Sequence, residues 1–202
     1  MKPDARGFRA GASAAARDTR GAVYVEFIVA FLPFFIMFLC LWQVAILYWT
    51  KLMVDHAAFS AARAAAVIVA EDPNNVGDSS GTANQLTNTR AGLIQNAATI
   101  ALAPLMINGT LDSISLAYPD PTQPPGSADA MMNKSYTPMS GNSVGNIRVR
   151  VTATMQCRIA FANMIMCATF AQKQFGTFGF NPTISIVSEY PYPFQGAAYT
   201  YQ

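Results

Sequence analysis

Charged residues are scarce in this sequence. They make up 12% of its 202 residues, whereas 52% are hydrophobic, and soluble domains usually carry about 25% charged residues. The net charge is only +2, and residues 148–158 hold three arginines, too few for a surface that binds the phosphate backbone of nucleic acids. The composition therefore argues against a nucleic-acid partner and indicates that part of the chain lies in lipid.

Histidine is nearly absent as well, since the chain has one. His56 has no companions at the spacing of metal ligands, so we expect neither a metal nor another cofactor. The string Gly141 to Gly145 matches the G-x-S-x-G pattern of hydrolases, but that pattern needs a histidine later in the chain and His56 comes earlier. A turn before a strand explains the string better. We expect no catalytic residue and no enzyme activity.

One long run contains no charged residue at all, from Phe27 to Trp49. As a helix it would span about 35 Å, which exceeds the hydrocarbon core of about 30 Å, and it is too long for the apolar region of a cleaved secretory signal. Five Lys and Arg precede it within residues 1–21, so the positive-inside rule places the N-terminus in the cytoplasm. Tyr48, Trp49 and Lys51 would then lie at the outer interface.

The function of this apolar run is indicated by the string at its start, Arg20-Gly21-Ala22-Val23-Tyr24-Val25-Glu26-Phe27. It resembles the class III signal of type IV pilins, in which a prepilin peptidase cuts after the glycine. The resemblance implies a mature N-terminus at Ala22, with Glu26 and Phe27 serving recognition and assembly as in the Flp/Tad branch.

The segment from Asp55 to Ala66 resembles the Ala/Arg stretch that follows the membrane helix in the TadE-like family. This resemblance implies a minor pilin or pseudopilin of a Tad/Flp tight-adherence pilus, anchored in the bacterial inner membrane by a single span. The partners it implies are membrane lipid, the prepilin peptidase, other pilin subunits and the Tad assembly platform.

The physics of Glu26 agrees with an assembly role. A charged side chain within a membrane helix costs about 2.5–3.5 kcal/mol and needs a partner. The N-terminal end of the helix dipole would favour this carboxylate. By resemblance its partner is the amino terminus of a neighbouring subunit, and the alternative is that Glu26 extends to the cytoplasmic headgroups. A rival function is a signal-anchored envelope binding protein that is neither processed nor assembled.

Alanine has the best helix propensity, so the membrane helix should continue outward until Glu71-Asp72-Pro73, where proline ends it. Pro33 lies inside this helix, where a proline can be accommodated with a local kink. We expect a leader over 1–21, a pilin-like spine over 22–71 of about 72 Å, and an extracytoplasmic domain over 72–202.

The sequence of the outer domain predicts an α+β fold. Residues 72–84 resemble a flexible linker, residues 83–105 a second helix, residues 119–145 a long loop, and residues 190–202 an extended tail. Alternating apolar residues predict strands over 111–118, 147–158 and 183–189, which would form a small antiparallel sheet packed on the spine. Residues 159–170 read as a buried helix or an apolar excursion against the membrane surface.

The three cysteines divide between two environments. Cys40 lies in the predicted span and should stay free. Cys157 and Cys167 would lie on the oxidising side, where disulfides persist. Two alternatives remain open. The two cysteines form a disulfide with each other, or each is a separately buried small side chain.

Overall fold

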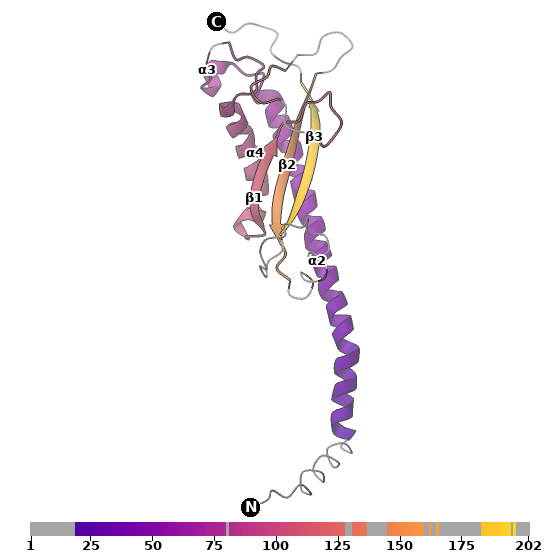
Figure 1. Ribbon diagram of the computed structural model, residues 1–202. Coiled ribbons are helices and arrows are strands. Elements are labelled where there is room, and N and C mark those ends of the chain that lie inside the picture. The colour runs from indigo at the N-terminus through magenta and orange to yellow at the C-terminus, as the bar shows by residue number, and fades with distance from the viewer. Residues whose placement is uncertain are drawn as a thin grey trace, which may run out of the picture.

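The computed structural model describes residues 19–79, 81–127, 131–136, 145–159, 162, 165, 183–194 and 196, with side chains from residue 23 on. The elements are the helices α2 (Thr19–Ile68), α3 (Pro73–Val76) and α4 (Asn88–Ile107) and the strands β1 (Leu111–Ala117), β2 (Asn146–Gln156) and β3 (Thr183–Pro193). The predicted α+β fold is confirmed. Figure 1 shows α2 running along the body of the domain and extending far below it.

Helix α2 is a single element of 50 residues that continues through Pro33. It ends at Ile68, three residues before the expected end at Glu71. The difference has a tertiary cause, because the carbonyl of Val69 accepts hydrogen bonds from the backbone N–H of Asn84 and from the Arg90 guanidinium. The end of α2 is therefore capped by groups that come later in the chain.

The strands form one antiparallel sheet in the order β1-β2-β3. The predicted alternation in the middle strand is confirmed, since its inward residues are buried and its outward ones only partly buried: Ile147, Val149, Val151, Ala153 and Met155 point inward. In β1 the register shifts between Leu111 and Ser113, so that Leu111 shares the inner face with Ile114 and Leu116. A strictly alternating strand would have put Leu111 on the opposite face.

Strand β3 runs four residues beyond its expected end at Glu189. It contains Pro191 and Pro193, which lack a backbone N–H, and such residues are tolerated at a sheet edge. Among the strands that the structure describes, β3 pairs with β2 alone, so it offers that edge. The first residues of the predicted extended tail therefore belong to the sheet.

The core lies between the inner face of the sheet and the two long helices. The upper part of α2 packs against α4, β2 and β3, and α4 also packs against β1. The buried side of α2 is made of small residues, namely Ala57, Ala58, Ala61, Ala62 and Ala65, all fully buried. Alanines let the helix backbone approach its neighbours closely, so α2 is built into the domain and does not merely carry it.

The connection between α2 and α4 differs from the predicted flexible linker. Asp72 caps α3, Gly77 takes a left-handed conformation (φ 76°), and the side chain of Asp78 turns inward. The Asp78 carboxylate accepts hydrogen bonds from the Thr87 hydroxyl at 2.7 Å and from Arg90 Nε at 2.8 Å. This segment is therefore anchored to the first turn of α4.

Helix α4 buries only part of the set of residues that recur at helical spacing along it, which includes Arg90 and Ile94 as well as Leu93 and Ile100. It begins after the N-cap Thr87, and its buried residues are Arg90, Ile94, Ala98, Leu102 and Leu105. Leu93 and Ile100, which the helical spacing places among the apolar set, are 40% and 75% exposed. The ion pair of Arg90 with Asp78 explains the difference, because it directs a charged residue inward and the buried residues then follow it at intervals of about four.

Candidate membrane anchor and assembly site

The predicted processing position lies at the beginning of α2. Gly21 and Ala22 have helical backbone within its first turn. The helix is already formed at the peptide bond between them, and the rest of the leader lies outside the described residues. Cleavage after Gly21 remains a prediction at this point.

Glu26 lies about one turn further along the helix, and its side chain is exposed. It is the only charged residue between Val23 and Trp49. Within the part of the chain that the structure describes, no Lys or Arg forms an ion pair with it. An isolated carboxylate on an apolar helix is costly in lipid, so its position calls for a partner outside this chain or in the headgroup layer.

Phe27 begins a row of aromatic rings on the same side of the helix. Phe27 stacks on Phe31 with centroids 5.3 Å apart, and Phe31 stacks on Phe35 at 5.7 Å. Their spacing of four residues places them above one another on one helix face. Phe27 is 61% exposed, so the row is a surface feature and supplies no core contact to the domain.

The exposed apolar surface continues to the point where α2 enters the domain. Tyr48 and Trp49 are 66% and 60% exposed, and Lys51 follows them with its Nζ 2.6 Å from Asp55 Oδ1 and 3.1 Å from the Val187 carbonyl oxygen. Partial burial raises the pKa of the Asp55 carboxyl, but hydrogen bonds from Lys51 and Ser188 outweigh this effect and hold the pKa below its ordinary value. The aromatic and basic side chains therefore lie together at the base of the domain, as expected for an interface.

Gln43 is a buried polar residue that was not predicted. It lies inside the predicted span, yet only 1% of it is exposed, and neither polar atom of its amide has a hydrogen-bond partner. Thr50 is fully buried about two turns further along the same face, and its hydroxyl donates to the Ile46 carbonyl. The available signal was the amide itself, the only one between Phe27 and Trp49. One side of α2 is thus covered by protein well below Trp49.

The cysteines and the G-x-S-x-G string are only partly covered by the described residues. Cys40 is a free thiol, as expected. Cys157 is fully buried and engaged in a disulfide, but Cys167 lies outside the described residues, so their pairing stays a prediction. Of the G-x-S-x-G string only Gly145 is described, and its carbonyl accepts a hydrogen bond from the Phe194 N–H at 2.7 Å.

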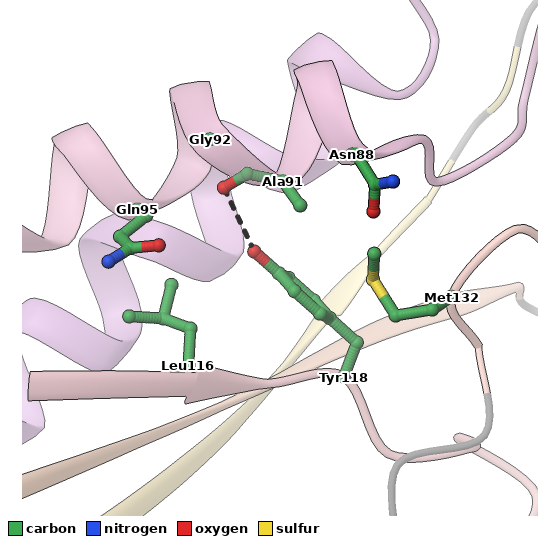
Figure 2. A pocket seen from close by; sticks show the side chains of 7 residues that line it. All are labelled: Asn88, Ala91, Gly92, Gln95, Leu116, Tyr118 and Met132. Carbon is green, nitrogen blue, oxygen red and sulfur yellow. Dashed lines mark hydrogen bonds between the residues drawn. The ribbon is translucent and has the colours of Figure 1, made fainter.

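A small pocket of about 350 Å³ opens between α4 and the end of β1. Figure 2 shows Tyr118 crossing it, with its hydroxyl donating to the Ala91 carbonyl at 3.3 Å. The other lining residues are Asn88, Gly92, Gln95, Leu116 and Met132. None of these seven residues is charged, and burial raises the pKa of the Tyr118 hydroxyl. The lining therefore offers neither an acid nor a base near neutral pH.

Residues 21–63 match the family model described as TadE-like protein. The resemblance inferred from the N-terminal sequence is thereby confirmed over this segment, which begins at Gly21 and includes Glu26, Phe27 and most of α2. No curated protein and no solved structure matches the chain. The comparisons thus support the anchor and its extension and leave the outer domain to be interpreted from its own residues.

Proposed function

Because residues 21–63 are similar to TadE-like protein, we propose that the chain is a minor pilin or pseudopilin of a Tad/Flp pilus system. It is made in the inner membrane with a cytoplasmic leader, and a prepilin peptidase removes the leader after Gly21. The mature subunit then takes part in pilus assembly and surface adherence. The proposal gives the chain no catalytic role.

The placement of Glu26 is the observation that supports this proposal most directly. Cleavage after Gly21 would leave Ala22 as the first residue and Glu26 about one helical turn above it. The carboxylate is exposed, so the amino terminus of a neighbouring subunit could reach it, and burial of both charges between packed helices would strengthen their attraction. Phe27 and the ring row behind it would supply the adjoining apolar contact.

The upper part of α2 supports a subunit rather than a tethered binding module. Its alanine face is buried in the domain core, so a displacement of the helix along its axis would carry the domain with it. Such a rigid connection suits a subunit that is drawn out of the membrane as one body. A signal-anchored binding protein has no need of it and would function equally well on a loose tether.

The decisive experiment follows the N-terminus of the full-length protein. We expect intact mass and N-terminal sequencing to give Ala22 as the first residue when a Flp-type prepilin peptidase is co-expressed, and Met1 when it is absent. Gly21→Leu should block the cleavage, whereas Gly92→Leu, at a position on α4 with no atom near an added Cβ, should not. A chain that keeps its leader with an active peptidase would instead support the signal-anchored binding protein.

Assembly is tested separately with Glu26→Gln, which keeps the size of the side chain and removes its charge. We expect this variant to be cleaved normally and to be lost from sheared surface material while it accumulates in the inner membrane. Normal incorporation of Glu26→Gln would remove the proposed pairing with a neighbouring amino terminus, even if processing occurs.

A further inference from the structure

The end of α4 carries two exposed apolar side chains. Met106 is 41% exposed and Ile107 84%, and the helix ends there at the cap Asn108. A single exposed apolar residue is common on protein surfaces and needs no explanation. Their position relative to α2 makes these two informative, because Figure 1 shows the α4–β1 turn at the lower end of the domain, where α2 leaves it.

The level of this turn along α2 can be fixed from above. The Arg90 guanidinium contacts the carbonyls of Val69 and Glu71 at the upper end of α2. Helix α4 then descends beside α2 (Figure 1), and the 17 residues from Arg90 to Ile107 cover about 26 Å. The same distance back along α2 from residue 70 reaches roughly Met53, about one turn above Trp49.

The sheet gives a second measure from below. Val187 lies beside Lys51, and Thr183 lies four residues, or about 13 Å, closer to the free part of α2. Thr183 pairs with Gln156, whose N–H donates to the Thr110 carbonyl in the α4–β1 turn at 3.2 Å. The first estimate places the α4–β1 turn above Tyr48 and Trp49 along α2, and the second places it below them. The turn therefore lies near the level of these interfacial aromatic residues.

The bilayer boundary also lies lower on α2 than the run of uncharged residues indicates. Gln43 is buried within the protein, so lipid does not surround the helix there. The stretch from Val23 to Trp42 still spans about 30 Å, which is enough for the hydrocarbon core. Tyr48, Trp49 and the α4–β1 turn then fall in the headgroup layer.

The charge at this end of the domain suits headgroups. Arg158 is exposed, and its Nη1 lies 3.4 Å from the Asn108 carbonyl, directly beside the turn. Gly109 takes a left-handed conformation there (φ 63°), and a Cβ at this position would come within 3.0 Å of the arginine. The guanidinium thus lies beside the turn that directly follows Met106 and Ile107, which brings a phosphate-binding group close to an apolar surface.

We propose that Met106, Ile107 and Arg158, together the membrane rim of the domain, rest on the phospholipid headgroups of the membrane that α2 crosses. This inference rests on the membrane anchor of the proposed function. Ile107 and Met106 enter the headgroup layer beside Tyr48 and Trp49, and Arg158 binds lipid phosphate. The domain is thereby held by two points, the helix and the rim, and its orientation on the membrane is fixed until the subunit is extracted.

A helix from another protein could instead cover α4, because Leu93, Ile100 and Ile107 recur at intervals of seven residues on its exposed side. The two occupants predict different patterns along this row. A partner helix protects all three positions, whereas lipid protects Ile107 most and Leu93 least, since the row leads away from the membrane.

The test uses single-tryptophan variants of the full-length protein in vesicles of phosphatidylcholine and phosphatidylglycerol. Trp42 and Trp49 are replaced by Phe, and one tryptophan is introduced as Phe34→Trp, Leu93→Trp, Ile100→Trp or Ile107→Trp. Lipids brominated high on the acyl chain should quench Ile107→Trp, and acrylamide should quench it severalfold less than Leu93→Trp. Adding Arg158→Glu should restore much of the access of acrylamide to Ile107→Trp, whereas Arg63→Glu, at an exposed position on α2, should not.

Three results overturn the rim. They are equal quenching of Ile107→Trp and Leu93→Trp by acrylamide, protection of all three α4 positions without quenching by brominated lipid, and indifference of the quenching to Arg158→Glu. Phe34→Trp reports on the anchor itself, and it should be quenched by lipids brominated deep in the chain. If brominated lipid does not quench Phe34→Trp, both the membrane span of the proposed function and the membrane rim are wrong. If only Ile107→Trp lacks the expected quenching, the rim is wrong and the span stands.

Discussion

The two halves of α2 have opposite surroundings although they form one unbroken helix. Below Trp49 the large side chains of the helix are mostly exposed, with Phe27 at 61% and Leu41 at 60%. Above Thr50 the buried side is made mostly of alanines, and this part of the helix packs against the sheet and α4. The contrast shows that helix formation says little about surroundings, whereas side-chain size does, because large apolar groups need lipid or a partner and small ones permit close packing.

The comparison also locates the elements on which each half depends. The upper half is packed into the domain and should respond to changes there. The lower half is covered by protein only near its upper end, around Gln43 and Leu47, and should respond mainly to lipid and to other subunits. Substitutions in the two halves therefore differ in what they disturb.

Arg90→Met should have the largest effect. Arg90 is fully buried, Asp78 is 6% exposed, and removal of one partner from a buried ion pair costs about 3–5 kcal/mol because the other charge stays uncompensated. The carbonyls of Val69 and Glu71 would also lose a donor. We expect a correspondingly lower free energy of unfolding in urea titrations of the detergent-solubilised protein, followed by circular dichroism.

Two controls isolate the ion pair. Arg63→Met changes an exposed arginine on α2 and should alter stability by less than about 0.5 kcal/mol. The double variant Asp78→Asn with Arg90→Met removes both charges and should recover part of the loss. If Arg63→Met and Arg90→Met are equally stable, the upper end of α2 does not depend on the ion pair between Arg90 and Asp78.

Part of the molecule could be predicted from sequence because its signals are local. The run from Phe27 to Trp49 indicates a span without reference to any other segment, and the strict alternation from Ile147 to Met155 identifies a half-buried strand. The motif around Gly21 and Glu26 is likewise contained in a few consecutive residues. These features need only the helical or strand period and the cost of polar groups in lipid.

The features that were missed depend on residues far apart in the chain. The early end of α2 and the exposure of Leu93 and Ile100 on α4 both follow from Arg90, which reaches across about 20 residues to Val69 and Glu71. The inward position of Leu111 depends on a shift in pairing with β2, which no property of residues 111–117 specifies. Gln43 was visible as a lone amide, but its burial requires knowing what packs against α2.

The alanine face supplies a second prediction of intermediate size. Ala61→Leu adds bulk at a fully buried position of α2, and overpacking of a core costs about 1–3 kcal/mol. Ala45→Leu makes the same chemical change on the exposed lower half and should leave the domain as stable as the original. Urea unfolding of the two variants measures the difference, and equal stability of both would show that the alanine face is not closely packed.

Acid should weaken the ion pair between Arg90 and Asp78. Burial raises the pKa of the Asp78 carboxyl, but hydrogen bonds from Thr87 and Arg90 outweigh burial and hold the pKa below the ordinary value of 3.8. A carboxyl with a lowered pKa in the folded state stabilises the fold above about pH 4 and loses that contribution as the pH falls further. We expect the urea midpoint to drop between pH 5 and about pH 3, and to drop less in Asp78→Asn. An identical pH dependence in that variant would assign the acid sensitivity to other carboxyls.

The ion pair at the boundary between the halves should contribute least. Lys51 and Asp55 lie 2.6 Å apart, but each side chain is 44% exposed, and pairs in contact with water are worth about 0–1 kcal/mol. Lys51→Met keeps the apolar stem and should therefore lower the stability of the domain by no more than about 1 kcal/mol, measured by the same urea titration. A loss as large as that of Arg90→Met would mean that the Lys51–Asp55 pair is shielded from water and that the base of the domain is packed as closely as its upper end.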